Sequence, residues 1–107
     1  MVVKDNYMKT DFLCTYFIVD DASRVVKIGK SFDIEVRLRQ LQTGNGNRLR
    51  IALTLPAEST WLGKCLKGSW DESALHERFE ASRIRGEWFL FSDDIRQFIA
   101  NMIAEGA

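Results

Sequence analysis

The stretch FLCTYFIVDDASRVVKIG, residues 12–29, decides the expected fold of this chain. It contains two apolar runs, residues 12–19 and 24–29, on either side of Asp20-Asp21-Ala22-Ser23. Both runs are rich in β-branched and aromatic residues, which favour strands, and the short segment between them has the composition of a turn. The stretch therefore predicts a β-hairpin whose second strand is broken at Gly29-Lys30-Ser31.

A helix and a third strand are expected after this hairpin. Ser31 or Asp33 can cap the helix, whose first turn holds carboxylates that suit the positive end of the helix dipole. The helix should run to about Gln42, because the glycine- and asparagine-rich residues 44–47 stop it. Residues 48–55 then alternate basic or polar with apolar side chains, the period of a strand, and Pro56 is expected to close that strand.

The C-terminal half predicts two more helices. Residues 69–72 have the form of a capping box and should begin a helix that reaches about Ser82. Residues 88–91 can form a short extended segment, and Ser92-Asp93-Asp94 then caps a last helix. The apolar residues of this last helix follow helical spacing: Ile95, Phe98, Ile99, Met102 and Ile103.

Length and composition limit the class of protein. A chain of 107 residues, 46% of them hydrophobic, has room for a single domain over residues 1–107 with one core. Fifteen basic and fifteen acidic residues cancel, which argues against a polycation held to nucleic acid by bulk charge. The first ten residues lack the apolar run of a secretory signal, and no stretch approaches the ~20 apolar residues of a membrane span. We therefore expect a cytoplasmic protein without a membrane partner.

The charges are nevertheless uneven along the chain. Between residues 24 and 50 there are seven basic and two acidic residues, a net charge of +5. The basic residues are Arg24, Lys27, Lys30, Arg37, Arg39, Arg48 and Arg50. This excess could neutralise phosphates along one face, although a solvated surface with acidic neighbours from elsewhere explains it about as well.

Arg37 lies at the edge of the apolar stripe on the first expected helix. Ile34, Leu38 and Leu41 form this stripe, and Arg37 is rotated by about 60° from Ile34, whereas Arg39 points away. An arginine in this position can lay its aliphatic stem on the core and bind a phosphate through two parallel hydrogen bonds. The alternative is an ordinary surface arginine whose stem covers apolar groups.

Tyr16 and Lys27 lie within the two strands of the hairpin. A tyrosine in an apolar strand is usually a core residue with its hydroxyl at the rim. Lys27 interrupts an apolar run directly before Gly29, where the missing side chain lets a backbone or a ligand approach closely. Lys27 could equally lie on the solvent side of the strand.

The helix expected over 69–82 carries two polar residues on its apolar face. Glu72, Leu75, His76 and Phe79 occupy positions i, i+3, i+4 and i+7, so a carboxylate and the only histidine share one face. Glu72 could simply close the capping box, and His76 could be a core-edge imidazole bonded to the backbone. Together they could instead supply one metal-binding carboxylate and one proton-transfer group, as metal-assisted phosphodiester hydrolysis requires. Mg²⁺ or Mn²⁺ would then be expected rather than Zn²⁺, because a zinc ligand set is absent from the sequence.

Four segments occur in order between Cys14 and Phe98. They are Val26-Lys27-Ile28-Gly29, Arg37-Leu38-Arg39-Gln40-Leu41-Gln42-Thr43-Gly44-Asn45, Leu75-His76-Glu77-Arg78-Phe79 and Arg83-Ile84-Arg85-Gly86-Glu87-Trp88-Phe89. Each segment alone is a weak signal. In combination they resemble the GIY-YIG nuclease superfamily, closest to its phage and bacterial subgroup.

The resemblance implies an α+β fold, with a small three-stranded antiparallel or mixed sheet flanked by helices. It also implies a DNA endonuclease assisted by one Mg²⁺ or Mn²⁺ ion. Tyr16, Lys27, Arg37 and His76 would be the catalytic residues, and Glu72 the metal ligand. The residues expected to contact nucleic acid are Lys30, Arg39, Arg48, Arg50 and Arg85.

The sequence departs from the superfamily pattern at three positions. Cys14 and Thr15 stand where the superfamily has glycine and isoleucine, and Lys27 replaces the tyrosine of the second motif. Lys27 removes a hydroxyl, so either Tyr16 or His76 would have to move the proton. Specificity would come from the domain itself, a homodimer or a separate targeting partner. The alternative function is a nuclease-derived module that binds nucleic acid or another protein without cutting.

Overall fold

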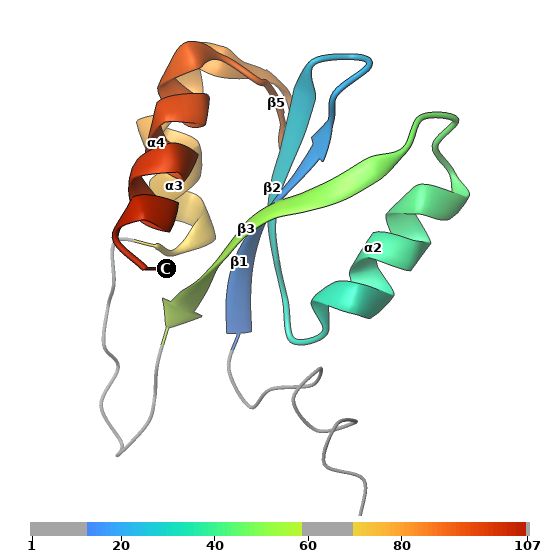
Figure 1. Cartoon of the computed structure of the whole chain (residues 1–107), viewed down its shortest axis with the longest axis horizontal. Helices are drawn as coiled ribbons and strands as arrows, with labels where there is room; N and C mark the ends of the chain where they lie inside the picture. The colour runs from blue at the N-terminus through green and yellow to red at the C-terminus, as the bar shows by residue number, and fades with distance from the viewer. Residues whose placement is uncertain (1–12, 59–69, 107) are drawn as a thin grey trace, which may run out of the picture.

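Five antiparallel strands form one sheet, and helices cover both of its faces (Figure 1). The computed structural model describes residues 13–58 and 70–106. The strand order is β3-β1-β2-β5-β4, so β1 and β2 lie in the middle. The expected α+β class is confirmed, but the expected three-stranded sheet is wrong because two further short strands extend it.

The hairpin expected from residues 12–29 forms the centre of the sheet. β1 (Leu13–Asp20) pairs with β2 (Val25–Ser31), and β2 continues through the glycine that was expected to break it. Tyr16 lies directly opposite Gly29 in this pairing. In the turn, Arg24 has a φ of 59°, and the Asp20 carboxylate accepts a hydrogen bond from the Ser23 N–H at 3.0 Å.

β3 (Leu49–Glu58) pairs with the other side of β1 and forms an edge of the sheet. The strand continues through Pro56, so the expectation that this proline closes it is wrong. Proline has no N–H to donate, but on an edge strand the missing donor can face away from the neighbouring strand. The pairing shifts register beside Cys14, which is the partner of Pro56.

α2 (Ile34–Thr43) lies against one face of the sheet, where Asp33 caps it by accepting a hydrogen bond from the Val36 N–H at 3.2 Å. Its apolar stripe packs against Tyr16, Ile18 and Leu49. The partly buried stripe residues are Ile34, Leu38 and Leu41. The expected helix and its stripe are therefore confirmed.

α3 (Glu72–Arg78) and α4 (Asp93–Ala104) cover the opposite face, where the larger core lies (Figure 1). Inward-facing residues of β1, β2, β3 and β5 meet both helices there. Three aromatic rings surround Phe98, with centroid distances of 5.7 Å to Phe17, 5.7 Å to Trp70 and 5.5 Å to Phe79. Among the described residues, no helix is long and apolar enough to cross a membrane.

α3 is shorter than the helix expected over residues 69–82. It begins at Glu72, ends at Arg78, and is followed by a 3₁₀ turn over Glu80–Ser82. Asp71 is the N-cap and makes no side-chain capping bond, so Glu72 is the first helical residue rather than the third. The capping-box interpretation of Glu72 is therefore wrong, and Ser69, its proposed partner, lies outside the described residues.

β4 (Arg83–Arg85) and β5 (Trp88–Leu90) form a second hairpin. The short extended segment expected over residues 88–91 is confirmed as β5, whereas β4 and the pairing of the two strands were not expected. Each strand has three residues, too few for a period of two to be recognised. Gly86 supplies the left-handed turn between them, with a φ of 58°. β5 then pairs with Val25, Val26 and Lys27 of β2 and so extends the central sheet.

α4 follows the expected pattern at its start and along its buried face. Ser92 caps it by accepting a hydrogen bond from the Ile95 N–H, at 3.5 Å, and Ile95, Phe98 and Ile99 are buried. Ile103 continues the spacing but is 55% exposed, because it lies in the last turn, where the helix leaves the core.

We predict that Phe98→Ala lowers the free energy of unfolding by about 3–5 kcal/mol, since it leaves a cavity among three aromatic rings. Ile103→Ala on the same helix should change it by no more than about 0.5 kcal/mol, because that side chain is exposed. Urea denaturation monitored by circular dichroism measures both values. Equal losses in the two variants would contradict the assignment of Phe98 to the core.

Candidate functional site

The Tyr16 side chain occupies the space left by the missing side chain of Gly29. A Cβ atom added at Gly29 would collide with the Tyr16 hydroxyl oxygen, and would lie 2.6 Å from Cζ of Tyr16 and 2.9 Å from Oε1 of Glu87. Tyr16 is 1% exposed. Gly29 therefore brings a phenol and a carboxylate together over the middle of the sheet.

Glu87 enters this site from the turn between β4 and β5. Its carbonyl accepts a hydrogen bond from the Ile28 N–H at 2.9 Å, which fixes the backbone of Glu87 beside β2. Its Oε1 atom lies 2.8 Å from Nζ of Lys27. Burial alone would raise the pKa of Glu87, but the Lys27 ammonium group and the Glu72 carboxyl group hold that pKa below its usual range.

Glu72 reaches the same site from the first turn of α3. Its side chain is 13% exposed, and Oε2 is buried without a hydrogen-bond partner among the described residues. Burial, a hydrogen bond shared with Glu87 and the negative charge of Glu87 raise the pKa of Glu72 to about 7. Near neutral pH Glu87 is therefore the ionised carboxylate of the site, while Glu72 keeps its proton to a higher pH than an ordinary glutamate does.

His76 lies one helical turn beyond Glu72 and is fixed by the backbone of β2. Its Nε2 atom lies 2.7 Å from the carbonyl oxygen of Ile28, and since a carbonyl can only accept, Nε2 carries the proton and donates. The ring packs against Phe89 at a centroid distance of 5.0 Å. In the neutral imidazole the lone pair is then on Nδ1.

Arg37 approaches Tyr16 from α2. Its Nε atom is buried and has no hydrogen-bond partner among the described residues. Burial and the charge of Glu87 raise the pKa of Tyr16 to about 12, while the nearby Arg37 guanidinium acts in the opposite direction. The Tyr16 hydroxyl therefore stays protonated at neutral pH and can donate a hydrogen bond.

The structure thus brings Tyr16, Lys27, Arg37, Glu72 and His76 into one neighbourhood. Lys30 is exposed, and it lies close enough to Glu72 for its positive charge to lower the pKa of that carboxyl group, against the effects that raise it. Glu87 was not among the site residues expected from the sequence, yet it lies against Lys27, Glu72 and the backbone of Gly29. Its position depends on the β4–β5 hairpin, which the sequence pattern did not reveal.

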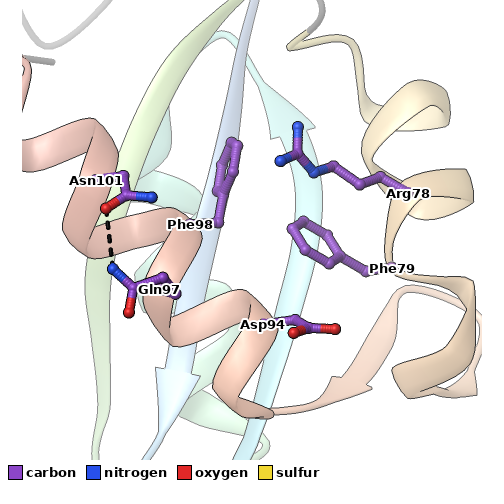
Figure 2. A pocket seen from close by; sticks show the side chains of 6 residues that line it. All are labelled: Arg78, Phe79, Asp94, Gln97, Phe98 and Asn101. Atoms are coloured by element: carbon purple, nitrogen blue, oxygen red, sulfur yellow. Dashed lines mark hydrogen bonds between the residues drawn. The ribbon is translucent and has the colours of Figure 1, made fainter.

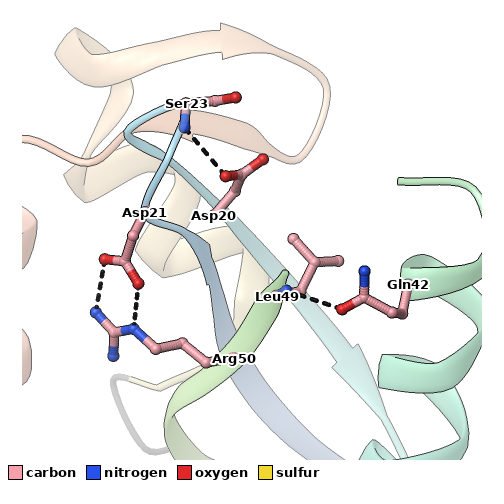
Figure 3. Close-up of polar contacts among 6 residues, drawn as sticks. All are labelled: Asp20, Asp21, Ser23, Gln42, Leu49 and Arg50. Carbon is pink, nitrogen blue, oxygen red and sulfur yellow. Dashed lines mark hydrogen bonds and ion pairs between the residues drawn. The ribbon is translucent and has the colours of Figure 1, made fainter. Parts of the chain in front are cut away.

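The remaining basic residues expected to contact nucleic acid are dispersed. Arg39 and Arg48 are exposed on α2 and just before β3. Arg50 forms a two-pronged ion pair with Asp21, at 2.7 and 3.1 Å, beside the β1–β2 turn (Figure 3). Arg50 pairs with Val19 in the sheet, whereas Tyr16 pairs with Thr54, so this ion pair lies further along β1 from the site. Arg85 is exposed at the end of β4, near Trp88.

The fit of a divalent metal depends on Glu72. Among the described residues, no group of three or more histidine, cysteine or acidic side chains is arranged to hold a metal ion. Mg²⁺, however, is commonly held by one or two carboxylates together with substrate phosphates and water. Oε2 of Glu72 is buried and accepts no hydrogen bond from the residues that the structure describes, which makes Glu72 suitable for that arrangement, while Glu87 is already paired with Lys27.

A cavity of about 300 Å³ lies between α3 and α4, away from the cluster around Tyr16 (Figure 2). The Arg78 guanidinium carbon lies 4.9 Å from the ring centroid of Phe98 and 5.7 Å from that of Phe79. Gln97 and Asn101 are hydrogen-bonded to each other at 2.9 Å on its rim. This cavity does not combine a carboxyl group of raised pKa with an unpartnered cation, so the cluster around Tyr16 is the stronger functional candidate.

Comparison with known proteins identifies the family. The chain has no significant match among curated proteins and none among solved structures. A family model, that of the T5orf172 domain, matches residues 12–103. The assignment to the GIY-YIG superfamily is therefore wrong, because it rested on four short segments, whereas this model matches most of the chain as a unit. The chain belongs to the T5orf172 domain family.

Proposed function

We propose that this protein is a divalent-metal-dependent endonuclease that hydrolyses DNA phosphodiester bonds. The observation that carries the proposal is a pair of buried atoms of opposite chemistry, Nε of Arg37 and Oε2 of Glu72, neither of which makes a hydrogen bond within the described part of the chain. Both side chains lie near enough to the Tyr16 hydroxyl to shift its pKa. Buried polar atoms without partners are rare in folded proteins, and a ligand that carries both a phosphate and a metal ion would satisfy both atoms.

Arg37 and Lys27 supply the positive charge for a phosphate. A guanidinium group binds phosphate oxygens through parallel hydrogen bonds, and it stabilises the charge that develops on them during hydrolysis. Lys27 is 2.8 Å from Glu87, so its orientation is already fixed in the free protein. Such pre-arranged groups need no rearrangement when the reaction occurs.

Glu72 is the residue that would hold Mg²⁺ or Mn²⁺. When bound, such an ion supplies Lewis-acid polarisation of a phosphoryl oxygen. The ionised form of Glu72 is the ligand, and its raised pKa means that metal and protons compete for the carboxylate near neutral pH. Metal binding should therefore strengthen as the pH rises through about 7.

His76 and Tyr16 are assigned different proton roles. Water attacks phosphorus and loses a proton to Nδ1 of His76, the nitrogen left unprotonated by the bond to Ile28. The bond between phosphorus and the leaving oxygen breaks, and that oxygen is protonated from solvent or the imidazolium. Tyr16, whose pKa is about 12, stays protonated and donates a hydrogen bond to a phosphate oxygen.

We predict that the purified protein nicks or cleaves supercoiled plasmid in the presence of Mg²⁺ or Mn²⁺, and that a chelator suppresses the reaction. Agarose gel electrophoresis of the plasmid forms measures the rate, with single-stranded and linear duplex DNA tested in parallel. If all three substrates remain intact with both metals at high protein concentration, the protein is a binding module rather than an enzyme.

We predict that Arg37→Ala lowers the cleavage rate by roughly 10²-fold or more, since a guanidinium group acts on developing phosphoryl charge. Arg39→Ala is the matched control on the same helix, because Arg39 is exposed. It should mainly weaken binding and reduce its salt dependence. Circular dichroism checks that both variants are folded, and an unchanged rate in Arg37→Ala would remove this residue from the active site.

Glu72→Gln should abolish cleavage and yet stabilise the metal-free protein at high pH. The folded-state pKa of Glu72 is raised from 4.5 to about 7, so the stability of the wild type falls as the pH rises from 4.5 to 7. Glutamine resembles the protonated carboxyl group and does not ionise. With chelator present, the variant should therefore melt at nearly the wild-type temperature near pH 4 and at a higher temperature at pH 8.

Adding Mg²⁺ or Mn²⁺ at pH 8 should raise the melting temperature of the wild type but not that of Glu72→Gln. This measurement does not depend on activity. An active Glu72→Gln variant would exclude this carboxylate as the metal ligand.

A further inference from the structure

The sheet face that carries the candidate site is only half covered. α2 packs against β1 and β3 on this face. The side chains of Val26 and Phe89 belong to the core on the opposite face, so their neighbours Val25, Trp88 and Leu90 lie on the same face as Tyr16. Among the described residues, the helix on this face, α2, packs on β1 and β3 and leaves the side formed by β2, β5 and β4 uncovered.

This uncovered part is apolar and hollow. Ile84 is 54% exposed and Leu90 is 52% exposed, two of the largest exposures among apolar residues of the described chain. A cavity of about 340 Å³ is lined by Val25, Ile84, Arg85 and Trp88. We refer to these four residues and Leu90 as the β5 surface.

The β5 surface is continuous with the candidate active site. Trp88 follows Glu87 directly in the chain and pairs with Lys27 in the sheet. Nζ of Lys27 lies 2.8 Å from Oε1 of Glu87 and 5.5 Å from the ring centroid of Trp88. The same ammonium group therefore borders both the charged cluster and the indole ring.

We propose that the β5 surface stacks an unpaired nucleobase next to the phosphate held at the active site. This inference rests on the proposed function, because that function supplies the nucleic acid. An aromatic ring on an apolar floor, bordered by Lys27 and Arg85, combines the stacking platform and the positive charge that single-stranded nucleic acids require. A base within a duplex has both faces stacked on its neighbours, so only an unpaired or extruded base can enter. The preferred substrate class is therefore nucleic acid with unpaired nucleotides at the cleavage position.

The test measures binding without cleavage. Fluorescein-labelled 12-nucleotide DNA of mixed sequence, single-stranded or duplex, is titrated with protein in the presence of chelator, and anisotropy gives the affinity. We expect the wild type to bind the single strand more tightly. Ile84→Glu should weaken single-strand binding about tenfold or more, as the loss of a stacking surface does.

Ile103→Glu is the matched control, since it makes the same substitution at a residue that is 55% exposed on α4. It has the same net charge as Ile84→Glu and should bind the single strand nearly as the wild type does. Trp88→Phe should bind more tightly than Trp88→Ala, because phenylalanine keeps a ring for stacking. Thermal melting identifies any variant that has lost its fold, and the Ile84 and Ile103 pair remains informative if the Trp88 variants unfold.

Three results would overturn the inference. They are equal losses in the two glutamate variants, equal wild-type affinity for the single strand and the duplex, and a wild-type dimer in light scattering that Ile84→Glu dissociates. The last result would make the β5 surface an interface between copies of the chain. Binding that depends on Ile84 without any cleavage would support the inference and refute the proposed function. Cleavage by the wild type, together with single-strand binding that Ile84→Glu leaves unchanged, would support the proposed function and refute the inference.

Discussion

The missing side chain at Gly29 is the constraint on which the candidate site depends. β1 and β2 pair with Tyr16 directly opposite this glycine, so the phenol lies across the strand where any other residue would place a Cβ atom. The same space admits the Glu87 carboxylate. The Tyr16 hydroxyl group and the Glu87 carboxylate, from residues 71 positions apart in the sequence, therefore meet over Gly29. Lys27 lies on the same face and balances the negative charge of Glu87.

The candidate site also depends on the point at which the pairing between β2 and β5 ends. β5 pairs with β2 only as far as Lys27, and the next residue, Ile28, presents its N–H and carbonyl on the side where β5 has ended. The N–H donates to the carbonyl of Glu87 and the carbonyl accepts from His76, at 2.9 and 2.7 Å. These two bonds place the turn before β5 and the helix α3 against β2. A longer β5 would exclude α3 from this edge, and with it Glu72.

The sequence predicted the elements that have strong periodicity and clear caps. The central hairpin, α2 and α4 with its Ser92 cap were expected and are present, and of the two caps considered for α2, Ser31 and Asp33, the structure has Asp33. Glu87 was not placed in the site, because its position follows from a hairpin of two three-residue strands whose pattern is too short to read. Local pattern also suggested a cap role for Glu72, whereas the helix begins two residues later than expected and turns this carboxylate toward Glu87. The family was wrongly assigned for a similar reason. The assignment relied on four short segments, which members of different families can share, whereas the T5orf172 model matches residues 12–103 as a unit.

The stability of the free protein is limited by the same residues that make the site. Two buried polar atoms, on Arg37 and Glu72, have no hydrogen-bond partner in residues 13–58 and 70–106, and each carries a desolvation cost that a paired atom would avoid. The charges of Lys27 and Glu87, by contrast, compensate each other, because these two side chains form an ion pair within the protein. Nε of Arg37 and Oε2 of Glu72 make no hydrogen bond among the described residues, although Oε2 lies 4.0 Å from Nε2 of His76. Substitution by a residue of similar shape that needs no partner would remove this cost. A buried cation and a buried carboxyl group of this kind are what a binding site for a charged ligand requires, since such sites commonly exchange stability for function.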